Sequence, residues 1–156
     1  MRAEFLMPVT LLTLLVSSAA LAADPAPEAA DPAPAAGPTL VATMSGADEV
    51  DDAGKRGQGD PKGAGSFSAR VDKDQLCYKL SWSKIDDPTM AHIHKGAAGA
   101  NGPVYIGLSD VDGEEHCEEV GRDRLDAIIA HPEKYYVNIH NGDFPGGAVR
   151  GQLDKR

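Results

Sequence analysis

Aromatic and basic residues are both scarce in this chain of 156 residues. Phe, Trp and Tyr make up 5% of the sequence, which is too few for the stacking platforms that bind bases or sugars. Lys and Arg number 15 against 24 Asp and Glu, for a formal net charge of -9. Because phosphate binding requires a basic surface, we expect no nucleic-acid partner and no attraction to anionic lipid.

Two catalytic signatures are also missing. The sequence has no Gly-x-Ser-x-Gly element, and no serine has an evident histidine partner by spacing, which argues against nucleophilic hydrolysis. The glycine runs at residues 96–102 and 146–147 are not followed by Gly-Lys-Ser/Thr, as a phosphate-binding loop would be. We expect tight turns at both places.

The chain begins with an apolar segment that ends in small residues. Residues 6–21 are mostly apolar, follow Arg2 and end in Ala20-Leu21-Ala22, which satisfies the small-x-small rule for signal peptidase. We predict a cleaved signal peptide at residues 1–22 and a secreted or periplasmic protein with no stable membrane span after cleavage. An uncleaved anchor is the alternative, but the apolar segment is short for a bilayer span and contains Pro8.

The composition changes after this segment. Residues 23–38 consist almost wholly of Ala, Pro, Asp, Glu and Gly, and we predict a disordered linker there because no large apolar side chain is available for a core. The remaining residues, 39–156, fit one domain of ordinary size.

The sequence has only two cysteines, Cys77 and Cys117. They form no Cys-x-x-Cys pair, and neither lies near the predicted cleavage site, where a lipid anchor would need one. An even number of cysteines in an exported chain favours one disulfide between them.

Short segments that alternate apolar and polar residues indicate strands, and turn-forming residues separate them. The polar connection 72–75 is short enough to join two of these strands in a hairpin. The glycine-rich and charged segment 51–63 predicts a long loop. The expected strands are residues 40–44, 65–71, 76–82, 90–94, 104–108, 135–140 and 148–153.

One segment has helical spacing instead. Residues 122–131 place Leu125, Ile128 and Ile129 on one face and stop before Pro132, which predicts a single short helix. Several short strands with one helix indicate an all-β fold, an antiparallel Greek-key-like β-sandwich or barrel.

Two of the predicted strands carry histidines at matching positions. Alternation along Ala91-His92-Ile93-His94 and Val137-Asn138-Ile139-His140 puts the apolar residues on the core face and the imidazoles on the other. If the two strands are neighbours, three imidazoles meet. Such a set of nitrogens suits copper first and zinc second.

Other residues near the histidines are candidate accessories. Met90 could supply a thioether to the same metal, and Asn138 and Asp143 could supply oxygens or orient the rings. The alternative is that the three histidines only hydrogen-bond to backbone carbonyls and to each other, which buried polar groups need with or without a metal.

Two long motifs resemble the CHRD domain, the module named for chordin. They are the segment 89–104, from Thr-Met-Ala-His-Ile-His to Asn-Gly-Pro-Val, and the segment 135–153, which includes Val-Asn-Ile-His and Pro-Gly-Gly-Ala-Val-Arg-Gly-Gln-Leu. The resemblance covers residues 39–153. It implies a β-sandwich-type extracellular module, and it specifies the fold better than the function.

The histidine pattern is also similar to the copper half of copper/zinc superoxide dismutases. In that resemblance His92 and His94 match the paired copper ligands, His140 a later ligand and Arg150 the arginine that guides the anion. No zinc-loop histidines and aspartate are evident between Gly96 and Val120. Arg150 has a second interpretation, which we favour, as a brace that pairs with Asp143 or another carboxylate.

Three hypotheses follow from the sequence. The first is an exported, non-enzymatic CHRD-type binding module that holds one copper or zinc ion through His92, His94 and His140. The second is a dismutase-like copper oxidoreductase in which Arg150 is catalytic. The third is an adhesion or structural module without metal whose partner is an extracytoplasmic protein.

Overall fold

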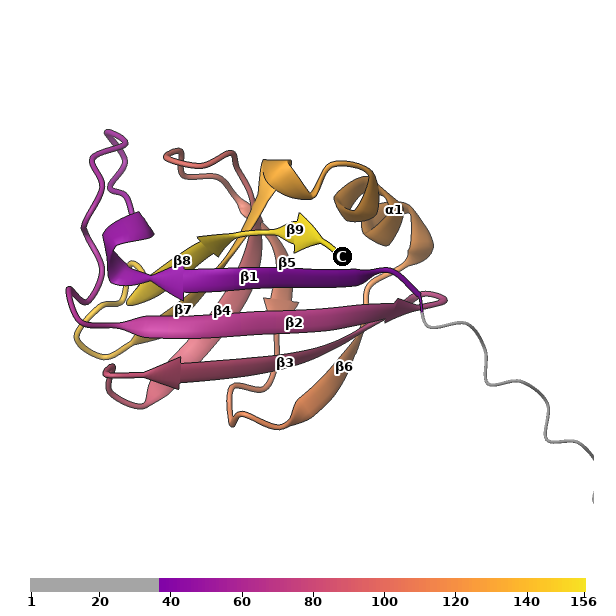
Figure 1. Ribbon diagram of the computed structural model, residues 1–156, viewed down its shortest axis with the longest axis horizontal. Helices are drawn as coiled ribbons and strands as arrows, with labels where there is room; N and C mark the ends of the chain where they lie inside the picture. The colour runs from indigo at the N-terminus through magenta and orange to yellow at the C-terminus, as the bar shows by residue number, and fades with distance from the viewer. Residues whose placement is uncertain (1–36) are drawn as a thin grey trace, which may run out of the picture. The chain divides into compact units, whose positions relative to one another are not determined.

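The structure is a computed structural model that describes residues 37–156 (Figure 1). The predicted signal peptide and all but the last two residues of the predicted linker lie outside this range. Within these described residues, nine strands form one antiparallel sheet: β1 (Thr39–Ser45), β2 (Ala64–Asp72), β3 (Gln75–Ser83), β4 (Pro88–Lys95), β5 (Val104–Leu108), β6 (Glu115–Glu119), β7 (Tyr135–Asn141), β8 (Val149–Gln152) and β9 (Asp154–Lys155).

The sheet curls into a nearly closed barrel. Its strand order is β5-β4-β7-β8-β1-β2-β3-β6, and β9 also pairs with β1. Figure 1 shows β1, β2 and β3 in front, with β4, β5 and β7 behind them. The predicted hairpin is present: Asp72 pairs with Gln75 at the end of β2 and β3. The prediction of an antiparallel all-β fold with one short helix is confirmed.

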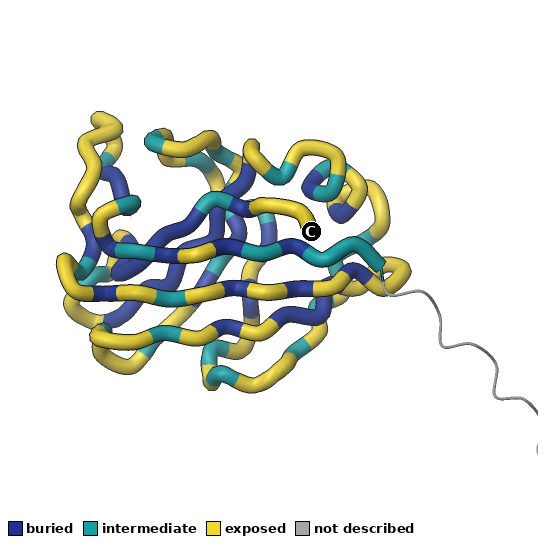
Figure 2. The backbone as a smooth tube through the Cα atoms, in the orientation of Figure 1, coloured by how far each residue is buried: buried dark blue, intermediate teal, exposed yellow. Residues whose placement is uncertain are grey.

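The core lies between the front and back strands. Buried and exposed residues alternate along the front strands (Figure 2), because one strand face packs inward and the other meets solvent. The apolar residues that alternation places inward are buried, with exposed fractions of 0 to 3%: Ala91, Ile93, Val137, Ile139, Val149 and Leu153.

The one α-helix in the described part of the chain, α1 (Arg122–Ala130), closes one end of the core. Leu125 and Ile128 are fully buried against the sheet. The short 3-10 helices η1 (Gly46–Asp48) and η2 (Pro132–Lys134) flank β1 and β7. In residues 37–156 no helix has the length and apolar character needed to cross a membrane.

Strand β6 was not expected from the sequence, where its residues appear as an acidic loop. It pairs with β3, and Cys77 lies directly opposite Cys117 in that register. The two cysteines form the expected disulfide. Three of the five residues of β6 are glutamates and only two are half-buried, so its sequence lacks the apolar alternation that marks a strand.

The burial of strand β7 differs from our expectation that one face of each strand is exposed to solvent. All seven of its residues are buried. Tyr136, Asn138 and His140 face away from the core, yet their exposed fractions are 2%, 2% and 6%. The loops after β1, β4 and β7 cover this outer face, and they create the environment of the histidines.

Candidate metal centre

The sheet brings the three histidines of the motif together. Strands β4 and β7 are antiparallel neighbours, with Met90 opposite His140, His92 opposite Asn138 and His94 opposite Tyr136. One ring nitrogen from each of His92, His94 and His140 lies within 4.8 Å of the other two. Ligands held at about 2 Å from one metal ion lie roughly 3 to 4 Å apart, so small ring rotations suffice to form a site.

Backbone carbonyls determine the tautomers of two of these rings. Nδ1 of His94 lies 2.9 Å from the carbonyl oxygen of Gly102, and Nδ1 of His140 lies 2.9 Å from that of Pro145. Because a carbonyl oxygen only accepts, both Nδ1 atoms carry the proton. Each Nε2 is therefore left with a free lone pair, and both rings are oriented as metal-binding histidines usually are.

The third ring completes the cluster. Nδ1 of His92 lies 3.1 Å from Nε2 of His140, so without a metal it donates its proton to that lone pair. Nε2 of His94 is buried and has no hydrogen-bond partner among residues 37–156. A buried acceptor without a partner costs stability, and a metal ion bound here would satisfy it.

All three imidazoles are held in the neutral form. Burial lowers the pKa of His92, and the neighbouring His140 and His94 lower it further. Burial also lowers the pKa of His94 and of His140, against the opposing effect of their hydrogen bonds to carbonyls. Neutral rings with lone pairs are the form that binds a metal at neutral pH.

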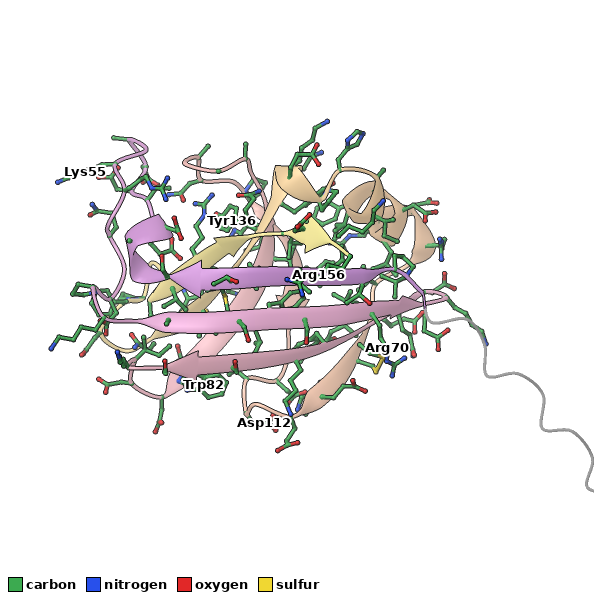
Figure 3. The ribbon with its side chains drawn as sticks, viewed as in Figure 1. Lys55, Arg70, Trp82, Asp112, Tyr136 and Arg156 are labelled. Carbon is green, nitrogen blue, oxygen red and sulfur yellow. A yellow bond between two sulfur atoms is a disulfide. The ribbon has the colours of Figure 1, made fainter. Side chains whose placement is uncertain are left out.

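A stack of side chains supports the His94 ring. The rings of His94 and Tyr136 are parallel, with centroids 4.7 Å apart, and the guanidinium carbon of Arg150 lies 3.4 Å from the Tyr136 centroid. Figure 3 shows Tyr136 between β8 and the loops at the top of the view. His94 comes from β4 and Arg150 from β8, the two strands that flank β7, so the stack spans three strands.

Arg150 is almost fully buried, with an exposed fraction of 2%. Its N–H groups donate to the carbonyl oxygens of Ala97 at 3.1 Å and Ala100 at 2.8 Å, and to Oδ1 of Asn101 at 3.2 Å.

These acceptors of Arg150 belong to the β4–β5 loop, which also supplies the Gly102 carbonyl. The guanidinium thus holds the loop that orients His94, and its partners are loop groups rather than Asp143.

The predicted accessory residues lie around the cluster but outside it. Met90 is 47% exposed on β4, opposite His140. Asn138 is buried between His92 and Arg150 in the strand register, and its Oδ1 has no hydrogen-bond partner in the described part of the chain. Asp143 is exposed in the β7–β8 turn, and it is not in the three-histidine group.

A buried carboxyl group near the site was not expected from the sequence. Glu49 has an exposed fraction of 3%, and burial raises its pKa to about 7, although the charge of Arg150 acts in the opposite direction. It lies in the acidic run Asp48-Glu49-Val50-Asp51-Asp52, which has the composition of a solvated loop. Glu49 directly follows η1 and its carboxyl group lies against Gly147 in the β7–β8 turn, and nothing in the sequence pattern indicates that contact.

Sequence comparison identifies the family of the domain. The family profile for the CHRD domain matches residues 40–153, which include every strand from β2 to β8 and all of the histidine cluster. The chain belongs to the CHRD domain family. No curated protein and no solved structure matches this CHRD domain.

Proposed function

We propose that this protein is an exported CHRD module that binds one copper ion, or zinc as second choice, through His92, His94 and His140. The observation that supports it most is the arrangement of tautomers. Two Nε2 lone pairs face a common space because carbonyls hold the opposite nitrogens, and the third ring lies within 4.8 Å of both.

In this proposal the ligands are Nε2 of His94, Nε2 of His140 and Nδ1 of His92. Nδ1 of His92 is the atom that faces His140 at 3.1 Å, and when metal binds there, Nδ1 loses its proton while Nε2 of the same ring gains one, so the imidazole stays neutral. Imidazole nitrogens bind both ions, and copper(II) has the higher intrinsic affinity for such donors. Met90 is our candidate for an additional soft ligand.

The mature protein should be treated with chelator and titrated with Cu(II) and with Zn(II) in separate experiments. We expect one ion per chain and strong loss of binding when His92, His94 and His140 are all changed to Gln. His131→Gln is the matched control, because His131 is an exposed histidine outside the cluster. Equal, weak uptake by both variants and by the unchanged protein contradicts the proposal.

Because the triple variant removes three buried or half-buried side chains, a single variant keeps the test valid. His92 is the least buried of the three, and His92→Gln should fold while losing one ligand. Retained near-UV circular dichroism together with lost Cu(II) binding supports the proposal. Elemental analysis of the protein from its native compartment then identifies the metal.

The structure favours this binding function over a dismutase-like one. An arginine that guides superoxide must present its charge to solvent, whereas Arg150 is buried and its N–H groups are used by the β4–β5 loop. We therefore propose Arg150 as a positioning residue. Copper-loaded protein that removes superoxide faster than free copper contradicts that assignment.

A further inference from the structure

A second feature on the same side of the domain is a cavity of about 420 Å³ that does not include the histidines. Its walls come from the β1–β2 loop, the β4–β5 loop and the β7–β8 turn. This volume is in the range of sites for small organic molecules. The cavity lies beside the candidate metal centre, because its wall residue Pro145 also supplies the carbonyl bound by His140.

The charge of the cavity walls has one sign. Four carboxylates line it, those of Glu49, Asp51, Asp52 and Asp143, and no Lys, Arg or His belongs to its described lining. Asp51 and Asp52 are partly engaged, because backbone N–H groups donate to Asp51 and the Asn101 side chain contacts Asp52. The ligand such walls select is a cation.

Glu49 is the observation that points to a ligand rather than to a solvated acidic surface. Its exposed fraction is 3%, and its Oε1 has no hydrogen-bond partner in the described residues. The carboxyl group lies against Gly147, where the backbone has a φ of 137° and where no space is left for a Cβ. A buried carboxyl group with an unpaired oxygen is costly, and a cationic donor reaching it from the cavity would satisfy it.

The spacing of the carboxylates argues against a single metal ion. Among the described residues, the three histidines are the only group of three or more potential ligands whose atoms all lie within 4.8 Å of one another. The four carboxylates are therefore too far apart to surround one ion together. Separated negative charges match a molecule that carries separated positive charges, and Phe144 provides an apolar wall for the chain between them.

We propose that this cavity binds a small aliphatic diamine, with one ammonium group at Glu49 and the other at the exposed carboxylates, of which Asp143 is the principal one. A free diamine and a pair of lysine side chains on a polypeptide share this chemistry. We assign the free diamine, because the inner carboxyl group is buried and a small molecule reaches it without a polypeptide backbone having to enter the cavity.

The test is a calorimetric titration of the mature, metal-free protein with butanediamine at low ionic strength. Chelator is kept present, because amines also bind copper. We expect one molecule per chain, binding by butylamine that is weaker by about tenfold or more, and loss of a similar size in Glu49→Gln and in Asp143→Asn. Asp87→Asn, which removes an exposed charge outside the cavity, should bind as tightly as the unchanged protein.

Several outcomes overturn the proposal. Absence of saturable binding, or an affinity for butylamine equal to that for the diamine, contradicts it. So does a loss of affinity in Asp87→Asn equal to that in Glu49→Gln. Tighter binding of Ca²⁺ or of a Lys-Lys peptide than of the diamine assigns the cavity to another ligand. The variant in which the three clustered histidines are Gln separates this proposal from the metal site. It should lose copper binding and retain diamine binding, so either function can fail without the other.

Discussion

Arg150 lies with its guanidinium carbon 3.4 Å from the centroid of the Tyr136 ring. The same guanidinium donates to the carbonyls of Ala97 and Ala100, and the same ring stacks on His94. This pair therefore connects the position of the β4–β5 loop to the orientation of a candidate metal ligand. Substitution of Arg150 tests this connection.

Replacing Arg150 with Lys keeps the charge but removes the planar group that covers Tyr136 and reaches several acceptors at once. We expect a loss of about 3 kcal/mol in the free energy of unfolding, because buried carbonyls lose their donors. Metal affinity should also fall by about tenfold, as is usual when groups that orient ligands are lost. Urea denaturation and Cu(II) titration measure the two effects.

The control for this variant is Arg70→Lys. Arg70 is exposed and makes one ion pair with Glu115 at 3.2 Å, so its loss should change stability by no more than about 1 kcal/mol. If both variants behave alike, the bracing role of Arg150 is wrong.

The pKa of Glu49 predicts a pH dependence of stability. Folding raises this pKa from 4.5 to about 7, so the folded protein binds the proton more tightly than the unfolded chain does. Stability from this group falls as the pH rises from about 4.5 to about 7, and the full change corresponds to about 3 kcal/mol.

Glu49→Gln should remove that slope and raise the unfolding free energy above pH 7, because a neutral amide no longer has to be ionised in a buried place. Denaturant midpoints measured across this pH range in the two proteins test the prediction. A slope that is unchanged in the variant would assign the pH dependence to other groups.

The histidine cluster predicts a dependence of the opposite sign. Burial lowers the pKa values of His92, His94 and His140, so the unfolded chain binds protons more tightly. The stability that comes from the neutral rings is present above the ordinary histidine pKa of about 6.5 and is lost as the pH falls through the lowered values.

Acid should therefore weaken both the metal-free fold and metal binding, since protons compete for the same lone pairs. The apparent Kd for Cu(II), measured at several pH values between about 5 and about 8, should rise steadily on acidification. The unfolding midpoint of chelated Glu49→Gln protein, which lacks the opposing effect of Glu49, should drop as the pH falls below about 6.5. A Kd that does not change with pH is inconsistent with imidazole ligands.

The disulfide predicts a loss of stability on its removal. Cys77 and Cys117 close a segment with a sequence separation of 40, for which the chain-entropy model gives about 4 kcal/mol. The double variant Cys77→Ser, Cys117→Ser should unfold at correspondingly lower denaturant. Hydrogen exchange should show the greatest loss of protection in β6, whose mainly acidic residues contribute little to the core.

The sequence predicted the strands whose two faces differ in polarity. Ala91 and Ile93 alternate with His92 and His94, and this alternation alone assigned the core face of β4. It failed for β6, because glutamates occupy both faces there and the strand is held by pairing to β3 and by Cys117. It also failed for the outer face of β7, which alternation assigned to solvent and which loops cover.

The sequence by itself determined which residues share a face: alternation fixes the direction of each side chain relative to its neighbours. It therefore placed His92, His94 and His140 together as soon as β4 and β7 were assumed to pair. Only the tertiary structure decided that they do pair, which nitrogens the Gly102 and Pro145 carbonyls leave free, and that Glu49 is buried. Those outcomes depend on contacts between distant loops, and short-range periodicity carries no information about them.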